Sequence, residues 1–437
     1  MKKWREKTRV IQSDCVILSG GTPRTECAAR AVEGPACVTS MPGIRLRIDA
    51  KIALLALALF LMTGAAANPR TVGSPSPDSV KQIVDATIPA LMAKDGIPGM
   101  AVGVALGGKT YVLNYGVASR DPRRPVTGET LFELGSLSKT FTATMASWAQ
   151  TQGYLKLTDP AGKYLPALAA TPFGRVTLIS LGTHTPGGLP LQVPGNVTNY
   201  DELIRYLKAW RPQYRMGTYR TYSNIGIGML GAITAKSMGQ DFRLLAQRRL
   251  FPALGLHHTF IDIPAGELAQ YAWGYGDNGR PIRMKLGTLG HEAYGVRATA
   301  ADVIRFVQEN IDPSALPGTM RNAILATHTG YFQAGVMTQD LIWEQYPYPV
   351  ALSSLLKGNA PKMIFDATPV RAIEPPQAPH ASVWLNKTGS TNGFAAYAAI
   401  VPSRKLGIVL LANHSYPIPD RIAAAYRILN ALATRLP

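Results

Sequence analysis

Three short groups of residues in this chain combine a nucleophile with side chains that can move a proton. Ser136 and Lys139 stand three positions apart at the expected start of a helix, so the lysine amine can reach the serine oxygen. Tyr222 lies mid-chain, and Lys387 opens a Lys-Thr-Gly sequence near the end. A lysine buried beside other cations has a lowered pKa, and a phenol beside two ammonium groups is favoured as phenolate. Because either change supplies a base for Ser136, the set predicts acyl transfer through a serine ester.

The surroundings of the serine suit the stabilisation of negative charge. Free N–H groups and the helix dipole at a helix start stabilise an oxyanion, and we expect the backbone N–H groups of Ser136 and Ser390 to form that oxyanion hole. Gly389, on a predicted strand, lets a bound carbonyl approach the backbone closely. Asn224, two residues after Tyr222, can hydrogen-bond an amide of the substrate.

Three patterns could support other chemistry but lack the residues that it needs. Ser354 and Lys357 repeat the Ser-x-x-Lys spacing without partners, and we expect only a helical surface pair there. Residues 226–231 match Gly-x-Gly-x-x-Gly, but no strand precedes them and no acidic residue lies about twenty positions on, which disfavours a dinucleotide site. The seven histidines are dispersed, with no His-x-His and no His-Glu-x-x-His, which disfavours a metal site.

The elements expected around these residues are strands at both ends of the chain and helices between them. Strands are expected at 100–106, 110–118, 383–389, 394–402 and 406–413, and helices at about 80–91, 137–152 and 420–436. This order predicts an α/β (α+β) fold, an antiparallel sheet with flanking helices plus a helical insertion. The expected domains are an α/β domain from 71–150 and 345–437 and a mostly helical domain from 151–344.

The composition is that of a globular chain with a basic surface. Of its 437 residues 46% are hydrophobic and 16% are charged, and the formal net charge is +18. The charges are scattered, with no basic run longer than Arg123-Arg124 or Arg248-Arg249 and no interleaved aromatic motif. We therefore expect a solvated basic surface and no nucleic-acid partner.

The first 67 residues have the character of a leader. A charged stretch from Met41 precedes an apolar run (52–62) that is too short to span a bilayer, and small residues follow up to Ala67. We expect residues 41–67 to be a signal peptide and residues 1–40 to be an unstructured upstream extension. All three cysteines lie in these first forty residues, so no disulfide is expected in the rest.

Longer strings show that residues 72 to 436 resemble class C (AmpC-type) serine β-lactamases. These strings are FELGSLSKTF (132–141), TPGGLPLQVP (185–194), TYSNIGIGMLG (221–231), EAYGV (292–296), WLNKTGSTNGFAAY (384–397) and GIVLLANHSYP (407–417). The resemblance implies the serine β-lactamase and penicillin-binding type of fold. It also implies hydrolysis of cephalosporins and penicillins through a Ser136 acyl-enzyme, with Lys139 and Tyr222 as general acid and base. No cofactor and no metal are expected, and the exported monomer would work in the periplasm, free of the membrane.

The resemblance also assigns roles to individual residues. Lys387 completes the catalytic set, and the expected substrate-binding residues are Gln192, Asn224, Tyr294, Thr388, Ser390, Asn392 and Arg421. Two positions depart from the family, which commonly has glycine where Asn392 stands and often has asparagine where Ile418 stands. The lost polar donor at 418 would weaken carboxylate contacts by about 1 kcal/mol. We expect the residues at positions 392 and 418 to affect which substrates the enzyme prefers.

Two other functions share this scaffold and stay open at the level of the sequence. One is a D-alanyl-D-alanine carboxypeptidase or esterase, although such relatives often replace the lysine of the third motif, so Lys387 favours the lactamase. The other is a penicillin-binding sensor that remains acylated. A sensor usually needs a signalling partner or a membrane anchor, and no transmembrane helix is expected after the signal peptide.

Overall fold

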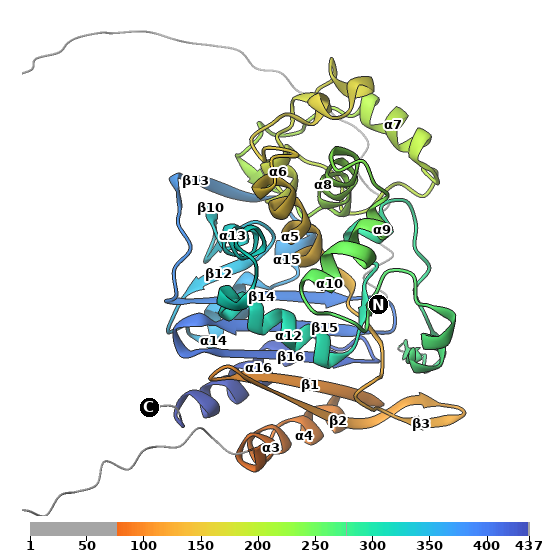
Figure 1. Cartoon of the computed structure of the whole chain (residues 1–437), viewed down its shortest axis with the longest axis vertical. Helices are drawn as coiled ribbons and strands as arrows, with labels where there is room; N and C mark the ends of the chain where they lie inside the picture. Colours follow the sequence, from red (N-terminus) through yellow and green to blue (C-terminus); the bar gives the residue numbers. More distant parts are fainter. Residues whose placement is uncertain (1–76, 277, 436–437) are drawn as a thin grey trace, which may run out of the picture. The chain divides into compact units, whose positions relative to one another are not determined.

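The computed structural model describes residues 77–276 and 278–435 and is built around an antiparallel sheet (Figure 1). The sheet has 11 strands in the order β3 (Arg123–Pro125), β2 (Lys109–Arg120), β1 (Gly99–Leu106), β16 (Leu406–Ala412), β15 (Ala395–Val401), β14 (Val383–Ser390), β12 (Glu344–Pro347), β11 (Met337–Gln339), β10 (Gly330–Ala334), β13 (Thr368–Gln377) and β5 (Tyr219–Arg220). This sheet with its flanking helices confirms the predicted fold class. The expected extension (1–40) and signal peptide (41–67) lie outside the described residues.

The two ends of the chain meet inside this sheet. β1 pairs with β2 on one side and with β16 on the other, so that Gly103 lies opposite both Val112 and Val409. Gly107 and Gly108 form the β1–β2 turn with φ of 58° and 86°, which confirms the predicted hairpin. The strands β14, β15 and β16 correspond to the three β runs predicted near the C-terminal end.

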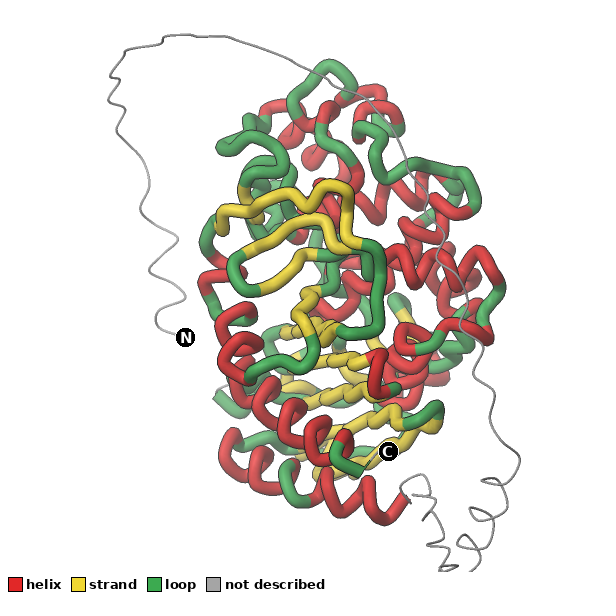
Figure 2. Tube along the Cα trace, turned by 90° about the vertical axis from the view of Figure 1, so that its left-hand side faces the viewer, coloured by secondary structure: helices red, strands yellow, loops and turns green. Residues whose placement is uncertain are grey.

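Helices cover both faces of the sheet (Figure 2). They are α3 (Pro77–Asp85), α4 (Ile88–Asp95), α5 (Ser138–Thr151), α6 (Leu178–Gly182), α7 (Tyr200–Ala209), α8 (Asn224–Ser237), α9 (Phe242–Leu245), α10 (Phe251–Ala253), α11 (Gly290–Ala293), α12 (Ala300–Ile311), α13 (Gly318–Thr327), α14 (Leu352–Gly358), α15 (Lys362–Phe365) and α16 (Ile418–Ala433). On one face Val84 of α3, Val102 of β1 and Ile422 of α16 share an apolar cluster. On the other face α12 packs on the sheet with α5 behind it, and the rings of Phe141 and Phe306 stack with centroids 4.3 Å apart.

The half of the sheet beyond β14 contains strands that the sequence did not predict. β10 and β11 lie within 151–344, the stretch expected to be mostly helical, while α6 to α13 fill much of the remainder. These strands are short, and β13 contains Pro369, Pro375 and Pro376, which argue against a strand when only local sequence is considered. Pairing within the sheet, which joins β13 to β10 and to β5, therefore decides their structure. The division of the chain into two domains remains a prediction.

Two further sheets are short and lie outside the main sheet. One has the order β4 (Phe132–Glu133), β9 (Arg297–Ala298) and β6 (Thr259–Phe260), and the other pairs β7 (Gly274–Tyr275) with β8 (Pro281–Ile282). The β7–β8 hairpin lies against the turn after β14, because the Tyr275 amide donates to the Gly393 carbonyl oxygen at 3.3 Å.

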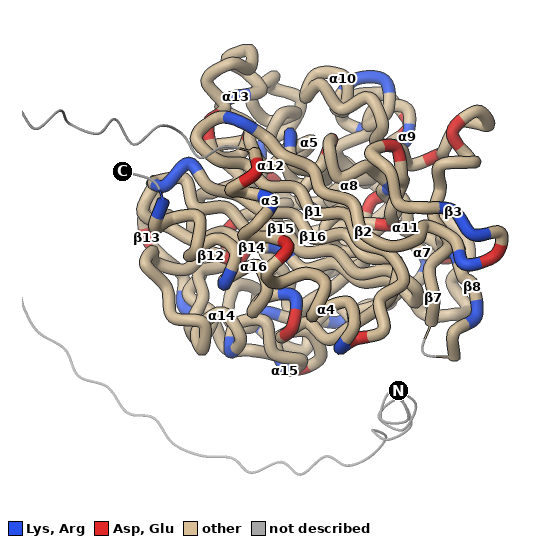
Figure 3. Tube along the Cα trace, turned by 90° about the horizontal axis from the view of Figure 1, so that it is seen from below, with Lys and Arg blue, Asp and Glu red and all other residues tan. Residues whose placement is uncertain are grey.

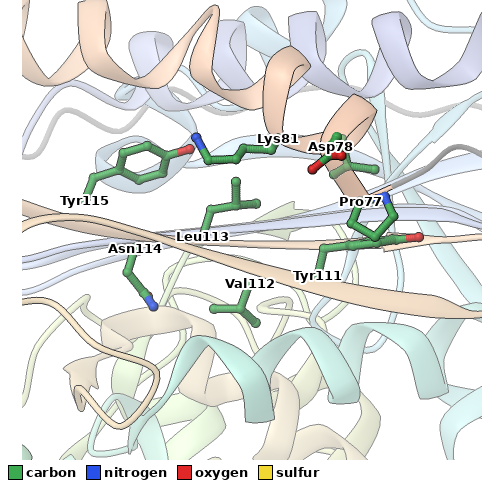
Figure 4. A pocket seen from close by; sticks show the side chains of 9 residues that line it. Pro77, Asp78, Lys81, Tyr111, Val112, Leu113, Asn114 and Tyr115 are labelled. Carbon is green, nitrogen blue, oxygen red and sulfur yellow. The ribbon is translucent and has the colours of Figure 1, made fainter.

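A cavity of about 460 Å³ lies between α3 and β2, at one edge of the main sheet (Figure 4). Its lining includes Pro77, Asp78 and Lys81 of α3 and residues 111–115 of β2. Beside it the Tyr115 hydroxyl donates to Asp85 Oδ1 at 2.7 Å. None of the residues from the three sequence motifs lines this cavity, so it is not part of the candidate site.

Charged residues of both signs are spread over the described chain rather than gathered in one field (Figure 3). This agrees with the scattered basic residues of the sequence. None of the helices in the described ranges combines the length and apolar character needed to cross a lipid bilayer. Likewise, no group of three or more His, Cys, Asp and Glu side chains in those ranges is arranged to hold a metal ion.

Candidate active site

The turn that carries Ser136 lies directly against strand β14, and two glycines make this approach possible. Ser136 belongs to the 3₁₀ turn Gly135–Leu137, which leads into α5, and its side chain is partly exposed. Gly135 has a φ of 52°, and a Cβ there would lie 2.6 Å from the backbone nitrogen of Ser390. A Cβ on Gly389 would lie 2.0 Å from a carbonyl oxygen preceding the turn. The backbone at Ser136 is therefore held beside the backbone at Ser390, as an oxyanion hole requires.

Lys139 lies one turn into α5, fully buried behind the serine. Its Nζ donates to Ser136 Oγ at 2.9 Å and to the carbonyl oxygen of Ala293, also at 2.9 Å. Burial and the charge of Lys387 lower the pKa of the Lys139 amine to about 8, although Tyr222 partly opposes this shift. Part of the Lys139 population is therefore neutral near physiological pH, and a neutral amine can accept a proton.

Tyr222 is buried two residues before the start of α8, between the two lysines. The centroid of its ring lies 5.2 Å from Lys139 Nζ and 5.1 Å from Lys387 Nζ. Burial alone would raise the pKa of the phenol, but the two ammonium groups and a hydrogen bond with Ser136 lower it to about 8. The ring also packs on His184, with the two ring centroids 4.4 Å apart. Part of the Tyr222 population is therefore phenolate near neutral pH, and a phenolate can accept a proton.

Arg220 and Glu344 belong to this cluster and were missed in the sequence. The Arg220 guanidinium carbon lies 5.4 Å from the centroid of the Tyr222 ring. Glu344 Oε1 lies 3.5 Å from Arg220 Nη2 and 3.6 Å from Lys387 Nζ. Burial tends to lower the pKa of Lys387, but Glu344 and Tyr222 outweigh it and raise that pKa, so Lys387 stays charged.

The two missed residues differ in whether any signal in the sequence could have found them. Arg220 stands two positions before Tyr222, a spacing that could have suggested a third cation near the phenol. Glu344 lies in no motif, and it reaches Lys387 only because β12 pairs with β14, with Glu344 opposite Asn386.

Three of the predicted substrate-binding residues line one cavity of about 260 Å³. They are Gln192, Asn224 and Tyr294, and the Asn224 amide nitrogen donates to Gln192 Oε1 at 2.8 Å. The Asn224 Oδ1 atom is buried and accepts no hydrogen bond from any described residue. An unpaired buried acceptor is costly, so this oxygen suits an N–H group supplied by a ligand.

The predicted residues on the strand side occupy different positions around the end of β14. Thr388 is buried in the strand opposite Tyr397, Ser390 is exposed at the strand end, and Asn392 is exposed in the turn that follows. Ile418 begins α16 and packs on the apolar cluster between the sheet and α16. The Ile418 side chain therefore contributes to the packing of α16 on the sheet.

Arg421 belongs to α16, and its buried side chain lies behind Ser390. Its Nη1 donates to the Gly389 carbonyl oxygen at 2.7 Å and to Ser390 Oγ at 2.9 Å. Its Nε donates to the Tyr416 carbonyl oxygen at 3.1 Å. The structure therefore places the guanidinium group of Arg421 against the backbone of β14, where it holds Ser390 in position. Direct contact between Arg421 and a substrate carboxylate stays a prediction.

We expect Arg421→Met to lower kcat/KM by about 10- to 100-fold, because hydrogen bonds to a charged group contribute about 1.5–3 kcal/mol each. The melting temperature should also fall, since the buried carbonyl oxygens of Gly389 and Tyr416 lose their donor. Asp420→Asn is the control, because Asp420 is the neighbouring residue and pairs only at the surface with Lys94. Steady-state kinetics and thermal melts of both variants test this, and an unchanged kcat/KM for Arg421→Met would contradict it.

The patterns that the sequence analysis set aside have structural roles. Ser354 and Lys357 lie in α14 with Lys357 exposed, as expected of a helical surface pair. The Gly226–Gly231 motif lies inside α8, where a Cβ on Gly231 would come within 2.9 Å of the Glu292 side chain. These glycines allow close packing of α8 against its neighbours.

Comparisons with known proteins agree with this geometry. The family model described as Beta-lactamase matches residues 84–433. A β-lactamase of Pseudomonas fluorescens is 46% identical over 353 residues, which cover 81% of this chain and 99% of that protein. A β-lactamase of Lysobacter lactamgenus is 46% identical over 374 residues, covering 86% and 97%.

Solved structures are similar over the same length. The D-alanine carboxypeptidase AmpC from Burkholderia cenocepacia is 57% identical with a TM-score of 0.78, covering 81% of this chain and 99% of that one. A class C β-lactamase in complex with cefoxitin is 48% identical with a TM-score of 0.79 and the same coverage. The chain therefore belongs to the β-lactamase family, in its class C group of serine hydrolases.

Proposed function

We propose that this protein hydrolyses the β-lactam amide of cephalosporins and penicillins through an acyl-enzyme on Ser136. The observation that carries this proposal is the contact between Lys139 Nζ and Ser136 Oγ at 2.9 Å, beside a phenol acidified by two lysines. This arrangement supports the proposal, because the partly exposed Ser136 in the turn before α5 would be the nucleophile and the groups beside it would serve as its base.

Acylation begins when the Tyr222 phenolate accepts the hydroxyl proton of Ser136. The serine oxygen bonds to the lactam carbonyl carbon, and the backbone N–H groups of Ser136 and Ser390 stabilise the oxyanion. The C–N bond of the lactam then breaks, and the nitrogen takes a proton from the Tyr222 phenol, with Lys139 sharing that proton. The product is a Ser136 ester.

Deacylation uses the same residues on a water molecule. Tyr222, again as phenolate, removes a proton from the water, which bonds to the ester carbon. The bond to Ser136 Oγ breaks, and that oxygen regains its proton from Tyr222. Lys139 and Lys387 keep the pKa of the Tyr222 phenol low in both steps, while Glu344 balances part of the positive charge of Lys387 and of the neighbouring Arg220.

Binding is divided between the cavity and the end of β14. Gln192 and Asn224 hydrogen-bond the acylamide of the substrate, with the unpaired Asn224 Oδ1 receiving its N–H, and Tyr294 lines the same cavity. Thr388, Ser390 and Asn392 lie on the side of the substrate carboxylate. We further expect the enzyme to act as a monomer in the periplasm, after removal of residues 41–67 during export.

A chromogenic cephalosporin tests this function. We expect purified protein lacking residues 1–67 to turn the compound over many times per enzyme molecule, with no added metal or cofactor. A single stoichiometric burst with a stable adduct would contradict the proposal and indicate a penicillin-binding sensor instead.

A second candidate activity is D-alanine carboxypeptidase. The observation that favours it is the 57% identity to a structure described as a D-alanine carboxypeptidase AmpC. Release of D-alanine from a peptide ending in D-Ala-D-Ala, measured beside cephalosporin hydrolysis, separates the two. Activity on the peptide with no turnover of the cephalosporin would replace the first proposal with the second.

A further inference from the structure

His184 is a buried residue beside Tyr222, and its backbone has an uncommon conformation. It lies two positions after α6, is 1% exposed and has a φ of 61°. The amide groups of its two neighbours in the chain each donate to a carbonyl oxygen of α6 at 2.9 Å. A left-handed φ away from glycine persists only where the surrounding structure holds it, and such residues cluster at functional sites.

His184 accepts hydrogen bonds from the residues on both sides of Tyr222. The Thr221 amide donates to the His184 carbonyl oxygen at 2.8 Å, and the Ser223 amide donates to His184 Nδ1 at 3.2 Å. The imidazole ring packs on the phenol ring, with the centroids 4.4 Å apart and an angle of 43° between the ring planes. One residue therefore contacts the backbone before Tyr222, the backbone after it and its ring.

The hydrogen bond from Ser223 also determines the charge of the imidazole ring. A ring nitrogen that accepts a hydrogen bond carries no proton, so Nε2 carries the proton and the ring is neutral. Burial and the charges of three neighbouring side chains lower the pKa of His184 well below its usual range, which agrees with a neutral ring. These side chains are Arg220, Lys139 and Lys387. Because His184 adds no charge beside the phenol, it acts on Tyr222 through its position.

The position of Tyr222 matters because the acidity of a buried phenol depends on its distance from positive charge. The charged and titratable groups that face Tyr222 come from separate elements of the fold. They are Lys139 of α5, Lys387 of β14, Arg220 of β5, Glu344 of β12 and the neutral His184. A phenol that moved away from the two lysines would lose the charges that favour phenolate, while burial would still oppose it.

We propose that His184 is the positioning residue for Tyr222 and holds the phenol hydroxyl between the two lysines of the site. The Nδ1 atom is the critical one, since its loss would leave the buried Ser223 amide without this acceptor and would release the backbone that follows the phenol. The proposal rests on the function proposed above, because it names the residue that orients the base of that reaction.

Two substitutions of His184 separate the acceptor from the ring. His184→Phe keeps an aromatic ring against the phenol but removes the acceptor. His184→Asn replaces Nδ1 by an oxygen acceptor bonded to the same carbon, and asparagine tolerates a left-handed φ. The readouts are kcat and kcat/KM for a chromogenic cephalosporin and the pH midpoint of kcat/KM.

We expect His184→Phe to lower kcat and kcat/KM together by about 10- to 100-fold, because a misplaced base weakens the transition state. Its pH midpoint should move to higher pH, since the phenol would lie farther from positive charge. His184→Asn should keep the wild-type midpoint and most of the activity.

His328→Phe is the matched control. His328 is also buried, its Nε2 atom forms a hydrogen bond with Asn310 Oδ1 at 3.0 Å, and its ring lies beside Trp343. It follows α13, outside the candidate site. We expect His328→Phe to lower the melting temperature and to keep the wild-type pH midpoint, as the loss of a purely structural histidine should.

The pH midpoint decides the proposal. An unchanged midpoint in folded His184→Phe overturns it, as does a His184→Asn variant or a His328→Phe control whose midpoint moves like that of His184→Phe. Should His184→Phe fail to fold, His184→Gly takes its place, because glycine tolerates the left-handed φ and also lacks the acceptor.

A titration without substrate separates this proposal from the underlying function. If the wild-type protein turns over no β-lactam, the proposed function fails, and the phenol is then titrated directly by ultraviolet absorbance of tyrosinate. The difference between each protein and the same protein carrying Tyr222→Phe isolates the titration of Tyr222. A higher midpoint in His184→Phe than in the wild type and His184→Asn supports the positioning role, and equal midpoints overturn it.

Discussion

Ser136→Ala is expected to abolish covalent labelling by a fluorescent penicillin and to lower kcat by about 10⁴-fold or more. The serine oxygen forms the ester in the proposed reaction, and it accepts a hydrogen bond from Lys139 Nζ at 2.9 Å. The change removes one oxygen from a partly exposed side chain, so the fold should persist. Labelling followed by electrophoresis, with steady-state kinetics, measures both effects.

Ser354→Ala is the matched control, because Ser354 has the same Ser-x-x-Lys spacing but lies in α14. We expect this variant to be labelled and to turn over substrate like the wild type. Labelling that persists in Ser136→Ala but disappears in Ser354→Ala would overturn the assignment of the nucleophile.

Tyr222→Phe is expected to lower kcat/KM by about 10²- to 10⁴-fold, the usual contribution of a general acid or base. The ring keeps its contact with His184, so the loss reflects the missing hydroxyl. In the wild type, kcat/KM should rise from pH 6 and level off above about 8, because the phenolate is the active form and the pKa of Tyr222 is about 8. Because Tyr222 and Lys139 titrate as a coupled pair, the midpoint of this rise in kcat/KM belongs to the pair rather than to one residue. In Tyr222→Phe the rise should be absent, or its midpoint should move to another pH.

Two further variants check the electrostatic origin of this pH dependence. Lys387→Met removes a positive charge beside the phenol, so the pKa of Tyr222 should rise and the midpoint should move to higher pH. Tyr426→Phe is a control, since the Tyr426 hydroxyl donates to the Val350 carbonyl oxygen outside the site, and it should keep the wild-type profile. A loss of less than tenfold in Tyr222→Phe would show that Lys139 alone suffices as the base.

Local sequence was enough to predict the elements whose signals lie within a few residues. Gly107-Gly108 between two β runs predicted the β1–β2 hairpin, and Gly153 marks the end of the helix that carries Lys139. The strands β14, β15 and β16 were also predictable, because their apolar runs are bounded by turn residues.

What the sequence did not reveal depends on contacts between distant segments. Glu344 approaches Lys387 through the register of β12 on β14, and nothing near residue 344 specifies that register. The position of Arg421 behind Ser390 depends on how α16 packs on the sheet. Thr288 and Val197, ninety-one positions apart, meet only because two loops converge on one cavity. Contacts between segments so far apart in the chain leave no pattern in the local sequence from which they could be predicted.

The pairing of β1 with β16 has a consequence for how the chain matures. β1 ends at residue 106 and its partner begins at residue 406, so one edge of the N-terminal hairpin stays open until nearly the whole chain has been synthesised. An open apolar strand edge is a site for aggregation. The turn that carries Ser136 also packs against Gly389 and Ser390 of β14, so the proposed active site cannot form before β14 has been synthesised. The proposed activity would thus begin only after the last strands have joined the first.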